Sequence, residues 1–379
     1  MIVGRRAWVM AGVSVSIVLA LPASAQVRRN EQERPPSMTL EEYEPHSMLV
    51  TEETEVRKAR FPFVDVHGHQ NLTRDDSSLA ALVAEMDAIR LRTLVNLSGG
   101  SGERLAAQVA NARAKYPGRF AVFANIDWNG IGEPGFAEAA AAQLERDVRE
   151  GGAVGLKIFK NLGMDTYWPD STRVRTDDPR LAPIWDAAGR LGIPVLIHTA
   201  EPPAFFRPLD AHNERYLELT LFPRRTRPPD RYPPFDTLMA EQHRMFRNHP
   251  NTTFISAHLS WLGQDLGRLG QLLDSIPNMH VEVAAALYEI GRQPRAGREF
   301  FIRYQDRILM GKDTFGGQDE FAVYFRIFET DDEYFPWYRK RHAFWGMYGM
   351  DLPDDVLRKV YYENALRIVP GLDADAFRN

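Results

Sequence analysis

From Phe61 onward, the sequence alternates short apolar runs rich in β-forming residues with longer stretches whose apolar residues recur at helical spacing. This alternation is typical of βα units, in which crossover helices join parallel strands. Most successive runs lie about 30 residues apart, enough for one strand, one helix and two loops. Eight such units favour an α/β fold of the (β/α)8 TIM-barrel type over an open doubly wound sheet. The predicted strands are Phe63–Val66, Thr93–Leu97, Phe120–Ile126, Val154–Phe159, Val195–His198, Thr253–His258, His280–Ala284 and Ile308–Asp313.

Two long segments follow the predicted fifth and eighth strands. Thr199–Asp236 is rich in proline and arginine, and Thr314–Met350 is rich in aromatic residues. Both come after the C-terminal ends of strands, where barrel enzymes build their active sites. Such segments often serve as lids or binding loops, although a collar that packs around the barrel fits these sequences equally well. We therefore expect one barrel domain over residues 61–379, with two long insertions.

The first 25 residues have the pattern of a secretory signal peptide. Arg5 and Arg6 precede an apolar run, and the small residues at 23–25 would form the cleavage site. A membrane anchor is the alternative, but the apolar run is short for one. Residues 26–60 are polar and read as an exposed N-terminal arm. We expect a periplasmic or secreted protein, exported by the general or the twin-arginine route, with no stable membrane span after cleavage.

Composition excludes several kinds of site and partner. The 379 residues include no cysteine, so disulfides, thiolate metal sites and cysteine nucleophiles are excluded. The formal net charge of −5 argues against nucleic acid, because neutralising phosphates requires a basic face. The expected partner is a small-molecule substrate, and the sequence leaves open whether the chain forms a homo-oligomer. Any metal must be held by nitrogen and oxygen ligands.

Histidine and aspartate stand at the ends of four predicted strands. His67 and His69 end the first, His198 the fifth, His258 the sixth and Asp313 the eighth. Alternate residues of a strand share a face, so His67 and His69 can point together into the barrel mouth. Imidazole and carboxylate ligands suit zinc, manganese, iron or nickel and leave a position open for water. One such histidine alone would more often be a hydrogen-bonded barrel residue, but the joint pattern predicts a divalent-metal site.

The segments that carry these residues resemble the amidohydrolase superfamily, in the amidohydrolase-related branch that includes aminocarboxymuconate-semialdehyde decarboxylase. The matching segments are VDVHGH (64–69), LGIPVLIHTAEP (191–202), HPNTTFISAHLSW (249–261), RILMGKDTF (307–315) and ENALRIV (363–369). The resemblance implies that the metal ligands are His67, His69, His198 and Asp313. It also implies that His258 binds the metal or polarises water or substrate, and that Asp313 can shuttle a proton.

The predicted fourth strand contains GLKIFKNLG (155–163), which looks like the strand-four segment of urease and dihydroorotase relatives. In those relatives a carboxylated lysine bridges two metals, and Lys157 is the matching residue. The alternative is an unmodified Lys157 paired with Asp313 or with a substrate carboxylate. We favour one metal over two, with zinc as the expected ion.

Three functions are compatible with this site. The leading hypothesis is a metal-dependent hydrolase, in which metal-activated water attacks a lactone, ester or amide with help from His258 and Asp313. The alternative is a metal-dependent, non-oxidative decarboxylase of a small carboxylic acid, for which an aromatic acid would suit the aromatic insertion. The third is an exported metal-binding protein without catalysis. The residues predicted to contact substrate are Lys160, Arg207, Arg215 and Trp337.

Overall fold

The computed structural model describes residues 37–39 and 41–378. The predicted signal peptide and residues 26–36 of the predicted arm lie outside the described residues. The chain divides into two compact units, residues 1–47 and 48–379, and the second unit holds the barrel. None of the helices in the described part of the chain is long and apolar enough to cross a membrane.

Parallel strands form one sheet of eight in the described residues, and their order in space follows their order in sequence. Beyond β8, hydrogen bonds from Val66 N to Met310 O (3.0 Å) and from Asp313 N to His67 O (2.7 Å) join the chain to β1. These bonds bring the sheet round into a barrel, which confirms the predicted (β/α)8 fold. The strands are β1 (Phe63–Gly68), β2 (Leu91–Asn96), β3 (Phe120–Asn125), β4 (Gly155–Ile158), β5 (Val195–Ile197), β6 (Phe254–Ser256), β7 (Met279–Glu282) and β8 (Ile308–Leu309).

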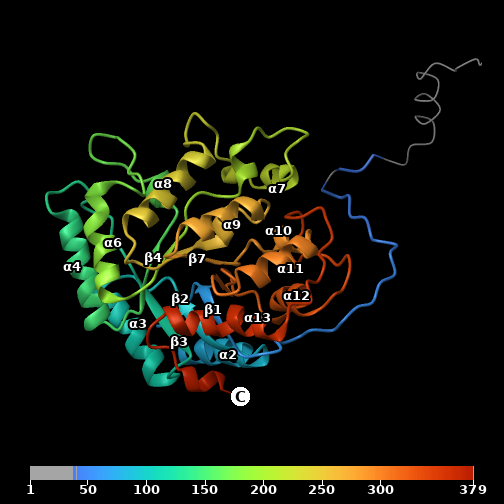
Figure 1. The fold of residues 1–379 in the computed structure, drawn as a ribbon, viewed down its shortest axis with the longest axis horizontal. Helices are drawn as coiled ribbons and strands as arrows, with labels where there is room; N and C mark the ends of the chain where they lie inside the picture. Colours follow the sequence, from blue (N-terminus) through green and yellow to red (C-terminus); the bar gives the residue numbers. More distant parts are fainter. Residues whose placement is uncertain (1–36, 40, 379) are drawn as a thin grey trace, which may run out of the picture. The chain divides into compact units, whose positions relative to one another are not determined.

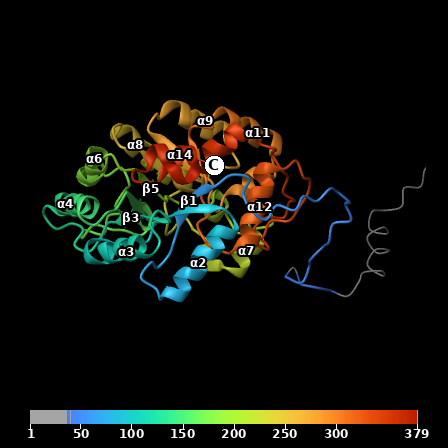
Figure 2. The ribbon, with the colours of Figure 1, turned by 90° about the horizontal axis from the view of Figure 1, so that it is seen from below.

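The helices lie outside the strands (Figure 1 and Figure 2). In α4, for example, the buried Ala137, Ala141 and Leu144 recur every three or four residues, which gives the helix one apolar face. The longer helices are α2 (Asp76–Ala88), α3 (Gly102–Lys115), α4 (Phe136–Arg149), α6 (Ala182–Leu191), α8 (Phe235–Asn248), α9 (Leu266–Ser275), α11 (Pro294–Arg303) and α12 (Gln318–Glu329). The shorter ones are α5 (Asn161–Met164), α7 (Tyr216–Leu221), α10 (Leu287–Gly291), α13 (Asp354–Arg358) and α14 (Asn364–Ile368).

Two apolar layers hold the barrel together. Side chains such as Val66, Phe123 and Ile255 fill the barrel interior, and a larger cluster packs between the strands and the helices. At the end opposite the predicted ligands, Asn364 Nδ2 donates to the carbonyl of Ile308 (2.8 Å) and fixes α14 beneath β8. Neither layer covers the C-terminal ends of the strands, where polar side chains lie instead.

The chain before β1 is attached to the segment that follows α12. Thr54 N donates to Asp332 Oδ2 (2.8 Å), and Arg60 N donates to Glu329 Oε1 (2.9 Å). The end of the predicted polar arm therefore packs on the barrel unit, next to the aromatic segment after β8.

Candidate metal centre

The predicted ligands lie where their strands end. β1 contains His67 and ends one residue before His69, whereas His198, His258 and Asp313 follow β5, β6 and β8 by one, two and four residues. Because all eight strands are parallel, these positions meet at one end of the barrel.

Gly68 separates the two histidines of β1 for a steric reason. A Cβ atom at this position would lie 2.7 Å from Leu94 Cδ2 on β2, too close for any side chain without movement of Leu94. Glycine therefore lets β1 lie against β2 while the rings of His67 and His69 stay 5.3 Å apart at the barrel mouth.

His67, His69 and Asp313 form one group that could hold a metal ion. Asp313 Oδ1 lies 3.7 Å from His67 Nε2 and 3.5 Å from His69 Nε2, and the three ligand atoms lie within 4.8 Å of one another. The His67 side chain is buried, whereas those of His69 and Asp313 are each 30% exposed. The group therefore faces the open end of the barrel.

Glu282, which ends β7, orients His67. Its Oε1 lies 2.8 Å from His67 Nδ1 and accepts a hydrogen bond from His258 N (2.8 Å). Since an ionised carboxylate only accepts, His67 Nδ1 carries the proton and Nε2 keeps the lone pair that a metal requires. His67, His258 and Glu282 also have ligand atoms close together, but in that group the carboxylate already accepts several hydrogen bonds. We therefore assign Glu282 to orientation rather than to metal binding.

His258 and His198 form a hydrogen-bonded pair. His258 Nδ1 lies 2.7 Å from the carbonyl oxygen of Ala284, which can only accept, so Nδ1 carries a proton. The other nitrogen, Nε2, lies 3.2 Å from His198 Nδ1. His198 Nε2 is buried and has no hydrogen-bond partner among the described residues. The predicted ligand His198 is therefore joined to the first group through His258, and its free Nε2 suits a ligand.

The electrostatic environment favours the metal-binding forms of these side chains. Burial lowers the pKa of His67 and His198 well below the usual histidine value and also lowers that of His69. These imidazoles are therefore neutral at neutral pH. Burial alone would raise the pKa of Asp313, but the histidines and Lys157 around it hold that pKa at about 2. Three neutral imidazoles and one ionised carboxylate are an appropriate donor set for a divalent metal.

Lys157 in β4 lies directly beside this group. Its side chain is 1% exposed, and its Nζ lies 3.5 Å from His67 Nε2. Burial lowers its pKa to about 8, although the negative charges of Glu282 and Asp313 act in the opposite direction. Among the described residues, no carboxylate lies within ion-pair distance of this nitrogen.

Backbone strain is concentrated at the same end of the barrel. Ala200 after β5, Ala285 after β7 and Asp313 after β8 have φ values of +62°, +50° and +76°. The four residues from His258 to Trp261, after β6, have φ between +50° and +58°. Left-handed backbone costs a non-glycine residue about 1 kcal/mol or more, and such strain clusters at functional sites.

Of the residues predicted to contact substrate, Lys160 is the one that lies next to a predicted ligand. Its Nζ bonds Glu201 Oε1 (2.5 Å), and Arg227 Nη2 donates to the same oxygen (2.7 Å). The other oxygen of Glu201 lies 3.9 Å from His198 Nε2. Lys160, Glu201 and Arg227 therefore form a charged cluster beside His198.

The other three predicted substrate residues have different surroundings. Arg207 is exposed, and Trp337 is buried with its ring 5.7 Å from that of Tyr288. Arg215 is buried and bonds both Glu218 and the hydroxyl of Tyr288 (2.5 Å each). Arg215 therefore ties the segment after β5 to α10 and has its charge already neutralised.

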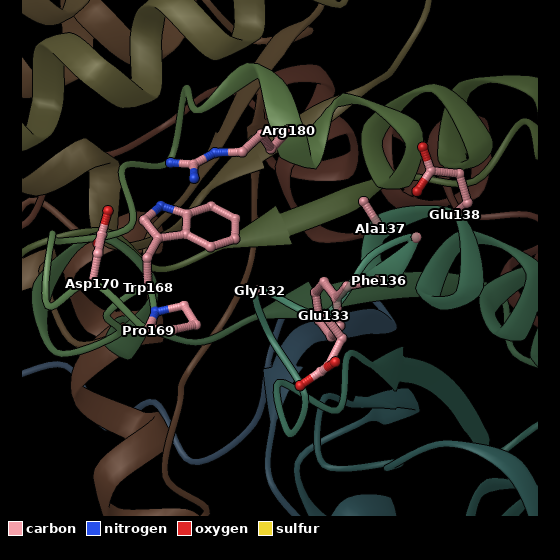
Figure 3. Close-up of a pocket in the computed structure, with 10 residues that line it drawn as sticks. Gly132, Glu133, Phe136, Ala137, Glu138, Trp168, Pro169, Asp170 and Arg180 are labelled. Atoms are coloured by element: carbon pink, nitrogen blue, oxygen red, sulfur yellow. The ribbon is translucent and has the colours of Figure 1, made fainter.

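A cavity of about 460 Å³ lies between the loop that precedes α4 and the segment that follows α5 (Figure 3). Its walls include Phe136, Pro169 and Trp168, whose ring is covered by the Arg180 guanidinium at 3.6 Å. None of the predicted ligands or substrate residues lines this cavity. It is therefore separate from the candidate metal centre.

Glu282, Glu201 and Arg227 are not among the residues predicted from the sequence. Glu282 offered a signal, because a carboxylate stands in the middle of the otherwise apolar predicted strand His280–Ala284. Arg227 lies in the long segment after β5 among several other arginines, and nothing local distinguishes it.

The comparisons with known proteins agree with this fold. The amidohydrolase family model matches residues 58–371, and no curated protein matches the chain. Among solved structures, the chain is similar to 2,6-dihydroxybenzoate decarboxylase from Rhizobium (16% identity, TM-score 0.52, covering 81% of this chain and 98% of that one). It is also similar to dihydroxybenzoic acid decarboxylase from Polaromonas sp. JS666 with bound manganese and 2-nitroresorcinol (14%, 0.53, 84% and 100%). A third similar structure is 4-oxalomesaconate hydratase from Rhodopseudomonas palustris (15%, 0.50, 83% and 97%).

At these identities the structural similarity establishes a shared fold, whereas the family match covers nearly the whole barrel unit. The match includes every strand and all the strand-end residues of the candidate metal centre. The chain therefore belongs to the amidohydrolase family and is an enzyme of that superfamily.

Proposed function

We propose that this protein is a divalent-metal-dependent carboxy-lyase, which releases carbon dioxide from a small carboxylic acid. The observation that carries the proposal is the buried Lys157, which has no carboxylate within ion-pair distance in the described residues. The carboxylates of Glu282 and Asp313 act on Lys157 only from beyond ion-pair distance. A buried ammonium without a direct ion-pair partner is costly, so this position favours a further negative group in contact with it. The carboxylate of a substrate would supply that partner. Two of the similar solved structures are named as dihydroxybenzoate decarboxylases, which supports the same chemistry.

The charged cluster beside His198 also favours an anionic substrate. Lys160 and Arg227 share the single carboxylate of Glu201, which leaves one net positive charge. The Lys160 side chain is 43% exposed, so an incoming carboxylate can reach it. A cationic surface at the mouth of a site attracts anions and raises their local concentration.

The donor set fits a divalent metal. His67, His69 and Asp313 would hold it, and His198, with its buried and unpartnered Nε2, is the fourth predicted ligand. A metal bound there would supply a Lewis acid that fixes and polarises oxygen atoms of the substrate.

In this proposal His258 delivers the proton that decarboxylation requires. The bond between the carboxylate and its carbon breaks, the electron pair stays on that carbon, carbon dioxide leaves, and one proton must be added. Because Ala284 O holds His258 Nδ1, the nitrogen that exchanges a proton is Nε2. The proton lost from His258 is replaced from water.

A metal-dependent hydrolase is the second candidate, and a property of Lys157 favours it. With a pKa of about 8, roughly one lysine in ten is a neutral amine at pH 7. A neutral amine is the form that reacts with carbon dioxide to give a carbamate. A carboxylated Lys157 could hold a second metal ion, and a two-metal site can activate water for hydrolysis.

Two measurements separate these candidates. In the first, purified protein is analysed for its metal:protein ratio and for the mass of the peptide that carries Lys157. A ratio near two with a carboxylated lysine would remove the cation on which the carboxy-lyase proposal rests and would support the hydrolase. A ratio near one with unmodified Lys157 is compatible with both candidates and leaves the decision to the second measurement.

In the second, manganese-loaded protein is incubated in deuterium oxide with a panel of hydroxybenzoic acids and other small carboxylic acids. We expect carbon dioxide release with deuterium on the vacated carbon. The variants Asp313→Asn and His258→Asn should lose this activity, while His212→Asn, at an exposed position, should keep it. Cleavage of lactones or esters without carbon dioxide release would contradict the proposal.

We also propose that the protein is exported and that residues 1–25 are removed. N-terminal sequencing of protein from the native host would then begin at Gln26. A mature chain that begins at Met1 would contradict this proposal.

A further inference from the structure

We infer that Trp261 is a positioning residue for His258, and that the strained turn between them serves to hold the two rings in contact. The inference rests on the proposed function, in which His258 exchanges a proton with the substrate.

The chain reverses direction after β6 through a left-handed turn. His258, Leu259, Ser260 and Trp261 have φ values of +58°, +54°, +55° and +50°, and none of them is glycine. Left-handed backbone is unfavourable for each of these residues, so the turn is strained. Such strain persists only where the surrounding structure imposes it, and such places are most often functional.

The turn brings the first and the last of these side chains together. A 3₁₀ turn has three residues per turn, so the side chains of residues i and i+3 lie one above the other. The rings of His258 and Trp261 accordingly stack at a centroid distance of 4.4 Å and an angle of 29°. The His67 ring also stacks on His258, at 4.9 Å and 29°. Two rings cannot share one face at these distances, so His258 lies between the indole and the imidazole of a predicted ligand.

Hydrogen bonds fix His258 only within the plane of its ring. Nδ1 bonds the carbonyl of Ala284, and Nε2 bonds His198 Nδ1. Motion out of the plane is blocked by His67 on one face and by Trp261 on the other. Of these two ring contacts, the one with Trp261 can be removed without replacing a predicted ligand.

Trp261 packs in the apolar core and at the same time covers one face of His258. Its Nε1 is buried and has no hydrogen-bond partner among the described residues, so its contact with His258 is made by the ring itself. A phenylalanine would fill most of the same space and keep a ring on His258. What the indole provides here is a wide flat surface against His258.

Trp185 on α6 offers a matched control. It is fully buried, and its Nε1 also has no hydrogen-bond partner in the described part of the chain. It contributes nothing to the candidate metal centre. Substitution at position 185 therefore reproduces the loss of a buried tryptophan without touching His258.

The test compares Trp261→Leu and Trp261→Phe with Trp185→Leu in the manganese-loaded enzyme. We expect W261L to lower kcat about 100-fold, as for a reacting group displaced by about 1 Å, with KM and metal content unchanged. W261F should restore most of the activity because it keeps a ring on His258. W185L should lower thermal stability and leave kcat unchanged. Wild-type kcat in W261L, or an equal loss in W185L, would overturn the inference.

Two further measurements show whether Trp261 acts through His258. In a His258→Asn background, W261L should cause no additional loss of kcat, and an additive loss would refute the positioning role. In spectra of 15N-histidine-labelled protein, the His258 Nδ1–H resonance should be sharp in wild type and W261F but broadened in W261L. If wild-type protein turned over none of the acids, the proposed function would fail, and the spectra alone would decide the role of Trp261. An unchanged resonance in W261L would refute that role.

Discussion

Replacing Glu282 by glutamine tests whether this buried carboxylate sets the metal-binding form of His67. Oε1 of Glu282 accepts from His67 Nδ1 and His258 N, both at 2.8 Å, and Oε2 accepts from Ala284 N at 2.5 Å. Glutamine has nearly the same shape but only one accepting oxygen. Its NH2 group must therefore face at least one of the three N–H groups.

The size of the effect follows from these contacts. At least one hydrogen bond to a charged acceptor is lost and one buried N–H is left without a partner, which should lower the free energy of unfolding by about 1–3 kcal/mol. If the NH2 group faces His67, the ring must accept at Nδ1 and carry its proton on Nε2, which removes the lone pair for the metal. Loss of such an orienting carboxylate typically lowers metal affinity about 10- to 100-fold.

The assay is titration of apoprotein with manganese in competition with a chelator, together with thermal unfolding. Glu329→Gln is the matched control, because Glu329 Oε1 also accepts from a backbone N–H and from the buried Tyr361 hydroxyl but lies next to no predicted ligand. We expect both variants to lose stability and only E282Q to lose metal affinity. Wild-type metal affinity in E282Q, or an equal loss in E329Q, would refute the reasoning.

Three further predictions concern stability and substrate binding. Burial lowers the pKa of His243 to about 3, so the folded state excludes a proton that the unfolded state binds below pH 6.5. The resulting stabilisation is complete above pH 6.5 and is lost as pH falls toward 3, by about 2 kcal/mol at pH 5. In urea unfolding, the free energy of unfolding of His243→Gln should therefore decline less between pH 7 and pH 5 than that of the wild type. Arg215→Met should lower the free energy of unfolding by about 3 kcal/mol, because it leaves Glu218 without its main partner. It should leave KM unchanged, and a raised KM would show that Arg215 contacts substrate after all. Arg227→Ala should raise KM for an anionic substrate and change kcat little, and an unchanged KM would argue against the charged cluster as a carboxylate site.

Much of the fold can be predicted from the sequence because helix and strand periodicities differ. Each of the eight observed strands overlaps a predicted strand. The largest error in a strand boundary, that of β8, falls at the functional end, and β6 also ends early there. β6 ends at Ser256 rather than His258, and β8 ends at Leu309 rather than Asp313. At both places the sequence remains compatible with a strand while the backbone turns left-handed.

The candidate site likewise contains residues that the sequence predicts and residues that it does not. Residues at strand ends, such as His67 and Asp313, could be predicted because parallel strands bring their C-terminal ends together. Trp261 could not be assigned a role, since its contact with His258 depends on a turn that β propensity does not encode. Arg227 could not be distinguished from its neighbours, because its partner Glu201 lies 26 residues earlier in the same irregular segment.

Gly311 illustrates why the missing information is three-dimensional. Its position in the strand-eight motif suggests a glycine needed for a turn, but its φ is not in the left-handed region. The structure gives another reason: a Cβ at Gly311 would lie 2.6 Å from Glu282 Oε2 and 3.1 Å from His67 Cβ. The glycine makes room on β1 and β7 for a ligand and for the carboxylate that orients it. A residue that acts by leaving space for two others cannot be interpreted until both are in place, so the role of Gly311 can be inferred only from the folded barrel.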